Sequence, residues 1–241
     1  MGSKISMNRS SGRLRMAEGL RWDVVLFDLD GTIIDPFDGI ADGVRKAFAE
    51  VGEPAPADER IRSWIGPPIG AAFAAELGHL GPDAVATALA TFRESYDNGG
   101  AQSATLHSGM RDLVITLRNA GAYVAVVTMK PRHVTEVILA QHGLLVELNG
   151  VFAPVADQAS SSKSELVAEA LVDARASRAT EMGGVVVGDR AEDMRAARVN
   201  DLAGIGVAWG FGSVDELLHE SPLKIATSPL ELATVLQLGK V

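Results

Sequence analysis

The sequence contains no cysteine among its 241 residues. This absence excludes disulfide bonds, thiolate nucleophiles and zinc sites built on cysteine. The five histidines are scattered along the chain without the spacing of metal ligands. A chain without cysteine suits a reducing compartment, and we expect a cytoplasmic protein.

Positive charge is also scarce. Lysine and arginine together number 22 against 31 aspartates and glutamates, which gives a net charge of −9 and a pI near 5.0. Nucleic acids and anionic membranes attract basic surfaces, so we expect neither as a partner. Every apolar run is far shorter than the roughly 20 residues that a membrane-spanning helix requires.

The first residues also lack the apolar core of a secretory signal. We expect residues 1–20 to be a disordered leader or a tag. The whole chain is 47% apolar and 22% charged, which is typical of a soluble globular protein with a sizeable core. Its length suits one large domain, or a main domain with an insert.

The stretch Asp23–Thr32 is the most informative part of the chain. Its apolar run, Val24–Phe27, is short and uninterrupted, which predicts a strand buried on both faces of a parallel sheet. Asp28 and Asp30 follow the run, and Gly31 lets the chain turn away. The carboxyl ends of such strands face the ligand crevice of open α/β sheets. Neighbouring carboxylates repel each other, so this ending favours a site built around a divalent cation.

The remaining sequence divides into a helical part and an alternating part. Helices are predicted over 38–48, 58–64, 71–77 and 82–96, and later over 108–119, 131–142, 163–174, 192–199 and 229–238. Further strands are predicted over 123–127, 150–155, 184–187 and 204–207. Alternation of strands and helices implies right-handed crossovers and a mostly parallel sheet with helices on both faces. We therefore predict an α/β fold: a Rossmann-like core of residues 21–35 and 105–241, with a small all-α cap of residues 36–104 inserted after the first strand.

Three more segments carry polar residues where the predicted sheet would bind a ligand. Thr128 ends the second strand, and Asp189 ends the strand over 184–187, with Asp193 one helical turn further on. Alone, each has an ordinary explanation in strand propensity or in the preference of helix starts for acidic residues.

In the third segment, Lys163 opens a predicted helix. Ser162 and Glu165 have the spacing of a capping box, which places Lys163 at the first helical position. A cation is unfavourable there unless it faces a bound anion. A solvated surface lysine is the simpler interpretation of this residue taken by itself.

Together these segments resemble the haloacid dehalogenase superfamily of phosphotransferases, from Arg21 onward. Asp28-Leu29-Asp30-Gly31-Thr32 matches the first motif, Thr128 the second, Lys163 the third, and Gly188-Asp189 through Asp193 the fourth. The segments 65–68, 127–131 and 188–190 are similar to the phosphoglycolate phosphatase and 5′-nucleotidase-like branch. Met129 stands where that branch often has a small polar residue.

The resemblance implies a first-type helical cap and a Mg²⁺-dependent phosphatase that acts on a small phosphate ester through an aspartyl-phosphate. It implies that Asp28 is the nucleophile and that Asp30 is the general acid and base. Phosphate binding is implied for Leu29, Thr128, Met129 and Lys163, metal binding for Asp28, Asp30 and Asp189, and a supporting role for Thr32 and Asp193. Candidates for specificity are Ile65, Gly66 and Pro67 at the cap tip, with Arg62 and Lys130 facing an anionic leaving group.

Several alternatives stay open at this stage. A phosphomutase similar to β-phosphoglucomutase would share the four motifs, and a non-catalytic regulatory protein could use the same scaffold. Retention of Asp30 disfavours a dehalogenase. Phosphoglycolate, a nucleoside monophosphate and a sugar phosphate all remain possible substrates, and the chain could be a monomer or a homodimer.

Overall fold

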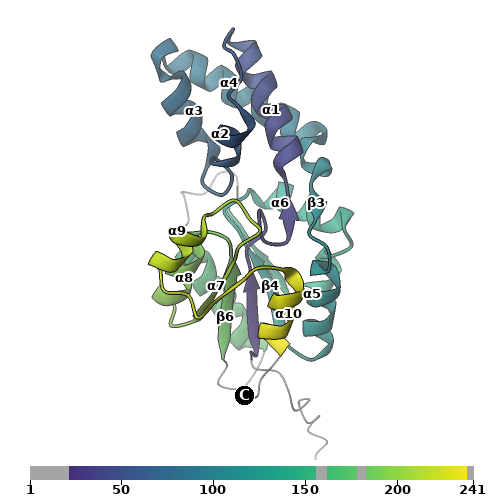
Figure 1. Cartoon of the computed structure of the whole chain (residues 1–241). Coiled ribbons are helices and arrows are strands. Elements are labelled where there is room, and N and C mark those ends of the chain that lie inside the picture. Colours follow the sequence, from purple (N-terminus) through teal and green to yellow (C-terminus); the bar gives the residue numbers. More distant parts are fainter. Residues whose placement is uncertain (1–21, 156–161, 178–182, 238–241) are drawn as a thin grey trace, which may run out of the picture.

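The computed structural model describes residues 22–155, 162–177 and 183–237, so the leader expected over residues 1–20 lies outside the described part. The core is a six-stranded sheet in the order β5-β4-β1-β6-β7-β8, and every neighbouring pair is parallel (Figure 1). The strands are β1 (Val24–Phe27), β4 (Tyr123–Val127), β5 (Gly150–Phe152), β6 (Gly184–Gly188), β7 (Ala203–Val207) and β8 (Lys224–Ala226). The predicted α/β fold with a parallel sheet is confirmed.

Strand β1 lies at the centre of the sheet, between β4 and β6, and its four residues are fully buried. Successive side chains of a strand point to opposite faces. Accordingly, Val25 and Phe27 belong to one hydrophobic cluster, while Val24 and Leu26 belong to the other. This two-sided burial explains why the run is apolar at every position instead of alternating.

Helices cover both faces of the sheet (Figure 1). The cluster that contains Phe27 includes residues of α5 (Met110–Asn119), α6 (Arg132–Gln141) and α10 (Pro229–Gln237). The opposite cluster is closed by α7 (Lys163–Ser177) and α8 (Ala191–Val199). The same apolar layer therefore holds the starts of α7 and α8 at the edge of the sheet.

Four helices stand beyond the carboxyl edge of the sheet in Figure 1. They are α1 (Phe37–Glu50), α2 (Asp58–Arg62), α3 (Ile69–Leu77) and α4 (Pro82–Ser95). Short helical turns at Gly78–Leu80, Tyr96–Gly100 and Ala101–Ser103 complete the segment. Strands β2 (Ile34–Asp35) and β3 (Thr105–Leu106) pair antiparallel where the chain leaves and re-enters the core. We call residues 36–104 the cap.

The cap has an aromatic centre. The ring of Phe73 lies 5.7 Å from that of Phe48, 6.2 Å from that of Trp64 and 5.7 Å from that of Phe92, all near edge-to-face. Phe92 in turn stacks on Tyr96 with the centroids 5.6 Å apart. Edge-to-face and offset rings add to the stabilisation that burial of aromatic area already provides.

The start of α1 differs from the prediction. The helix begins at Phe37, and Asp38 is exposed in its first turn without capping it. Instead the Asp35 carboxylate accepts the N–H of Phe37 at 2.9 Å. The intervening Pro36 has no N–H to satisfy, so the acidic residue before it can serve the first free donor.

Several short elements were not predicted: β2, β3, β8 and α9 (Val214–His219). The three strands have two or three residues, which is too short for a periodic pattern to show. The capping of α9 could have been found, since the Ser213 hydroxyl accepts the N–H of Glu216 at 3.0 Å. Strand β5 ends at Phe152, earlier than the predicted 155.

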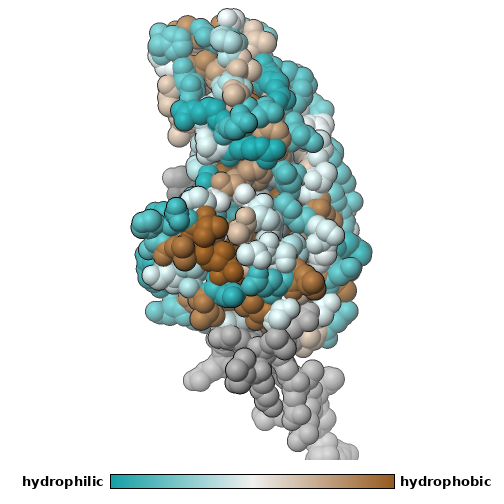
Figure 2. All heavy atoms as spheres, viewed as in Figure 1, coloured by the Kyte–Doolittle hydropathy of each residue, from teal (hydrophilic) through white to brown (hydrophobic). Residues whose placement is uncertain are grey.

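The surface in the view of Figure 2 is largely hydrophilic over the cap, with a hydrophobic area near α9. Val214 and Leu218 of α9 are among the exposed apolar side chains. Within the described ranges, no helix is both long and apolar enough to span a membrane.

We expect Phe73→Ala to lower the free energy of unfolding by about 3–5 kcal/mol, because it removes a fully buried ring and leaves a cavity between three others. Urea denaturation followed by circular dichroism measures the change. Leu80→Ala, on an exposed position of the same cap, is the control and should cost less than about 1 kcal/mol. Equal losses for both variants would contradict the role of the aromatic centre.

Candidate functional site

The predicted site residues converge at the carboxyl edge of the sheet. Asp28 directly follows β1, Asp189 directly follows β6, and Thr128 directly follows β4, which lies on the other side of β1. A cavity of about 290 Å³ opens between this edge and the cap. Its described lining consists of Asp28, Asp30, Gly66, Pro67, Thr128, Met129, Lys163, Arg190, Glu192, Asp193, Arg195 and Glu216.

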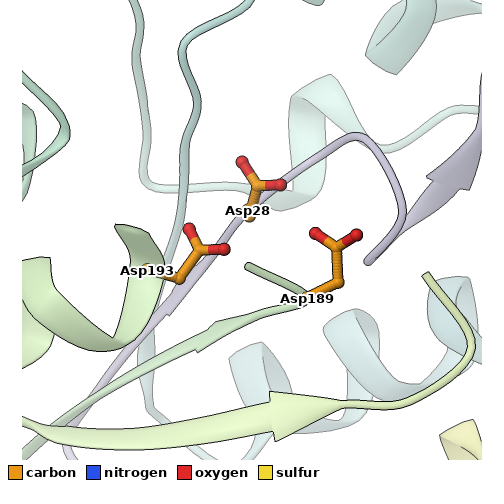
Figure 3. A group of neighbouring side chains, drawn as sticks. All are labelled: Asp28, Asp189 and Asp193. Carbon is orange, nitrogen blue, oxygen red and sulfur yellow. The ribbon is translucent and has the colours of Figure 1, made fainter. Parts of the chain in front are cut away.

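Three carboxylates meet at this edge. One oxygen each of Asp28, Asp189 and Asp193 lies within 4.8 Å of the other two, and all three residues are buried. Figure 3 shows the three side chains close together, with their carboxyl groups projecting toward the same side. Burial, reinforced by the neighbouring acids, raises the pKa of Asp28 well above its ordinary value. Such a cluster is unfavourable unless cations balance it.

One cation is supplied by the chain itself. Lys163 is the first residue of α7, and its Nζ contacts Oδ1 of Asp28 and lies 2.8 Å from Oδ1 of Asp193. Burial alone would lower the pKa of this ammonium, but Asp193 and Asp28 raise it above the ordinary value. The lysine is therefore a buried charge between two acids, and the interpretation as a solvated surface residue is wrong.

The local sequence explains how Lys163 reaches this place. Glu165 accepts the N–H of Ser162 at 2.6 Å, and the Ser162 hydroxyl accepts the N–H of Glu165 at 3.2 Å. This reciprocal pair is the predicted capping box, and it is confirmed. It sets the first turn of α7 so that Lys163 points into the sheet edge, while Leu166 and Val167 pack below.

Asp189 is held by a loop that follows β7. The N–H groups of Phe211 and Gly212 donate to its Oδ2 at 2.7 and 3.3 Å. A Cβ atom on Gly31 or on Gly210 would collide with the Asp189 carboxylate, so both glycines leave room beside it. The second oxygen, Oδ1, is buried and accepts no hydrogen bond from any described residue.

These features fit a divalent metal ion. Mg²⁺ prefers hard oxygen ligands, and it commonly takes one or two carboxylates together with water and substrate phosphate. The unpaired Oδ1 of Asp189 next to the Asp28 carboxylate offers that chemistry. Since a buried carboxylate oxygen without a partner is costly, a cation at this place would also stabilise the fold.

Asp30 is paired differently from the other acids. Lys130 Nζ lies 2.7 Å from Oδ2 and 3.0 Å from Oδ1 of Asp30. The same ammonium lies 4.9 Å from the centre of the Tyr96 ring, which belongs to the cap. Burial would lower the pKa of Lys130, yet Asp30 and Tyr96 raise it above its ordinary value. Lys130 was predicted to face an anionic leaving group, and in the structure its ammonium pairs with Asp30.

The remaining predicted residues of the core lie close by. The Thr128 hydroxyl accepts the N–H of Lys130 at 3.2 Å, and Met129 lines the cavity. Leu29 is fully buried, so it can offer a ligand only its backbone. Thr32 is buried, and its carbonyl accepts the indole N–H of Trp209 at 3.2 Å.

The cap residues divide into two groups. Gly66 and Pro67 line the cavity, as predicted for the cap tip. Ile65 is buried in the hydrophobic cluster that contains Phe27, and its carbonyl accepts a hydrogen bond from Arg190 of the core. Arg62 is exposed and lies 3.7 Å from the centre of the Phe37 ring, away from the cavity lining. Arg62 is therefore not among the described residues that line the cavity.

Four charged residues that the sequence did not single out also line the cavity: Arg190, Glu192, Arg195 and Glu216. Arg190, Glu192 and Arg195 lie at the N-cap and in the first turns of α8. From the sequence alone, acidic residues at this helix start are explained by the general preference of helix starts for negative charge. The direction of these three side chains toward the cavity follows from the start of α8 at the sheet edge. Glu216 comes from α9, an element that was not predicted.

Comparison with known proteins identifies the family. A family model described as haloacid dehalogenase-like hydrolase matches residues 25–208. The chain therefore belongs to the haloacid dehalogenase-like hydrolases, and the resemblance drawn from the four motifs is confirmed.

Relatives named for an enzymatic activity are similar over most of the chain. A 5′-nucleotidase of Pseudomonas aeruginosa is 31% identical over 218 residues, which is 90% of this chain and 97% of that protein. A phosphoglycolate phosphatase of Vibrio parahaemolyticus is 28% identical over 88% of this chain and 95% of that protein. The solved structure of protein tyrosine kinase A of Mycobacterium tuberculosis has a TM-score of 0.76 at 28% identity and covers 90% of this chain and 99% of its own.

We expect Mg²⁺ to raise the melting temperature more at about pH 8 than at about pH 5.5. Burial raises the pKa of Asp189 from its ordinary 3.8 to about 7. The folded chain thus holds a proton that the unfolded chain releases above about pH 4, and without metal its stability falls as the pH rises toward 7. Mg²⁺ binds the ionised carboxylate, so its effect grows over the same range.

Thermal unfolding across this pH range, with and without Mg²⁺, measures the difference. Asp189→Asn is the control, because it removes the titrating group while it keeps the size of the side chain. A Mg²⁺ shift that is equal at every pH would contradict the assignment of Asp189.

Proposed function

We propose that this protein is a Mg²⁺-dependent phosphatase that hydrolyses a small phosphorylated metabolite through an aspartyl-phosphate. One observation carries the proposal: the buried acids Asp28 and Asp189 share one edge of the sheet with the buried ammonium of Lys163, beneath a cavity closed by the cap. Membership of the hydrolase family and the phosphatase names of similar proteins support it.

Asp28 is the proposed nucleophile. Its carboxylate lines the cavity at the end of β1, where it can attack a phosphorus atom in line with the leaving group. Lys163 contacts this carboxylate and keeps it oriented, and the same ammonium can bind an oxygen of the phosphoryl group. Thr128 also lines the cavity and, together with the backbone after Asp28, would bind the other oxygens.

Asp30 is the proposed acid and base. It lines the cavity two residues from the nucleophile, so it can protonate the departing oxygen and then accept a proton from the attacking water. Lys130 holds both of its oxygens, which limits the positions that the carboxylate can take.

Asp28, Asp189 and the backbone carbonyl of Asp30 would hold Mg²⁺, while Asp193 positions Lys163 from behind. When bound, the ion offsets the negative charge of the transferring phosphoryl group. The cap excludes water from the cavity, which strengthens each of these electrostatic contacts.

The substrate is a small phosphate ester, with phosphoglycolate or a nucleoside monophosphate as the candidates that the similar proteins suggest. A phosphomutase of the β-phosphoglucomutase type is the alternative on the same scaffold. Product analysis separates the two, since a phosphatase releases inorganic phosphate and a mutase returns an isomeric sugar phosphate.

We expect Asp28→Asn to lower kcat for p-nitrophenyl phosphate in the presence of Mg²⁺ by about 10⁴-fold or more, because the amide is a poor nucleophile of the same size. Release of p-nitrophenolate measures the rate. Asp42→Asn, on the exposed face of α1, is the matched control and should retain full activity. Comparable turnover by the wild type and Asp28→Asn would remove Asp28 as the nucleophile.

We expect Asp30→Asn to slow hydrolysis of alkyl phosphates about 10²-fold or more in kcat/KM, and that of p-nitrophenyl phosphate much less. An alkoxide must be protonated as it leaves, whereas p-nitrophenolate is stable without a proton. The kcat/KM values of phosphoglycolate and p-nitrophenyl phosphate provide the comparison. An equal loss for both substrates would show that Asp30 serves another purpose.

A further inference from the structure

Arg190 joins the core to the cap at the rim of the cavity. It follows Asp189 directly, and its Nη2 donates to the carbonyl oxygens of Ile65 at 2.8 Å and Ser63 at 3.2 Å. Both acceptors belong to the cap loop that continues into Gly66 and Pro67, and this loop approaches the core below α2 in Figure 1.

The core side of Arg190 is fixed by two further partners. Its Nη1 lies 3.3 Å from Oε2 of Glu216 and 3.4 Å from the carbonyl oxygen of Phe211. Glu216 is itself held, since its Oε1 accepts the N–H of Ala191 at 2.8 Å. These core contacts orient the guanidinium without help from the cap, so little side-chain entropy is lost when it binds the cap loop.

The cap loop is shaped to receive this side chain. Gly66 has φ near +112°, a conformation that glycine adopts easily, and a Cβ atom there would lie 2.9 Å from Nε of Arg190. A residue with a side chain at this position would be strained and would also push against the guanidinium. The glycine and the arginine are thus complementary parts of one contact.

Other contacts between cap and core include the Lys130 ammonium against the Tyr96 ring and two hydrogen bonds near the chain crossover. The side chains of Gln141 and His142, in and just after α6, reach the carbonyl oxygens of Gln102 and Ala104, next to β3. Such contacts can persist while the cap pivots. The contact of Arg190 with Ser63 and Ile65 lies across the cavity mouth, so it must break when the cap opens.

We propose that Arg190 is a latch that holds the cap loop of residues 63–67 closed over the cavity, and that it acts as a positioning residue for the bound leaving group. The inference rests on the proposed phosphatase function, because it assigns closure to that site. The apparent affinity of a protein that binds substrate only in a closed state is proportional to the closed fraction. Loss of the latch lowers this fraction, whereas saturating substrate restores it.

The prediction is a division between KM and kcat. We expect Arg190→Gln to raise KM for phosphoglycolate and for p-nitrophenyl phosphate about 10- to 100-fold, with kcat within about threefold of the wild type. The Mg²⁺ concentration that gives half-maximal activity should stay unchanged, since the latch holds the cap and not the metal.

Hydrogen exchange measured by mass spectrometry provides a readout that needs no activity. Amides of residues 61–66 should exchange faster in Arg190→Gln than in the wild type, because Ser63 and Ile65 lose their contact with the core. Arg195→Gln is the matched control: Arg195 also lines the cavity, but its ion pair is with Glu220 of the core. This variant should leave exchange in the cap loop unchanged.

Gly66→Ala tests the same contact from the cap side and guards against an unstable Arg190 variant. It should raise KM and loop exchange in the same direction as Arg190→Gln. Unchanged exchange of residues 61–66 in both variants would overturn the latch. A Mg²⁺ requirement that shifts as far as KM would also overturn it, in favour of a role at the metal. If only the latch is wrong, Asp28→Asn still loses activity while the Arg190 and Gly66 variants show unchanged loop exchange. If the proposed function is wrong, Asp28→Asn keeps its activity, so the two failures are distinguishable.

Discussion

The contact of the Lys163 ammonium with the carboxylates of Asp28 and Asp193 is the interaction on which the sheet edge depends. Three buried acids within one small space would repel one another and lose their hydration. The lysine compensates part of that charge, and its place is secured by the capping box and apolar face of α7. What the ammonium leaves uncompensated is a carboxylate oxygen of Asp189, which suits a divalent ion.

The core and the cap share the task of building the site. The core supplies acids and the ammonium on rigid elements, which suits groups that must hold reacting atoms within fractions of an ångström. The cap supplies backbone and small residues at the mouth, Gly66 and Pro67, on the loop that we propose Arg190 holds closed. Arg190 and Lys130 are two of the side chains at which the two parts meet, through Ile65 and Tyr96.

The cations Lys130 and Arg190, which both contact the cap, have different kinds of partners. Lys130 is enclosed between Asp30 and an aromatic ring, so it belongs to a buried pair that is costly to separate. Arg190 bonds mainly neutral carbonyl oxygens of the cap and keeps its acidic partner within the core. A contact with neutral acceptors can be broken and reformed with less penalty, which fits a surface that opens and closes.

The longer helices and strands, the parallel sheet and the placement of the four motifs were determined by the sequence alone, because they depend on local patterns. The buried run of β1, the capping box before Lys163 and the acids that end β1 and β6 can each be recognised within ten residues. Contacts between distant segments could not be recognised in this way. The pairing of Lys130 with Asp30, the fixing of Arg190 by Glu216 and the turning of Arg62 toward Phe37 all depend on which side chains the folded chain brings into reach. Only the tertiary structure decided them, since a long charged side chain takes its partner from whatever lies within its length.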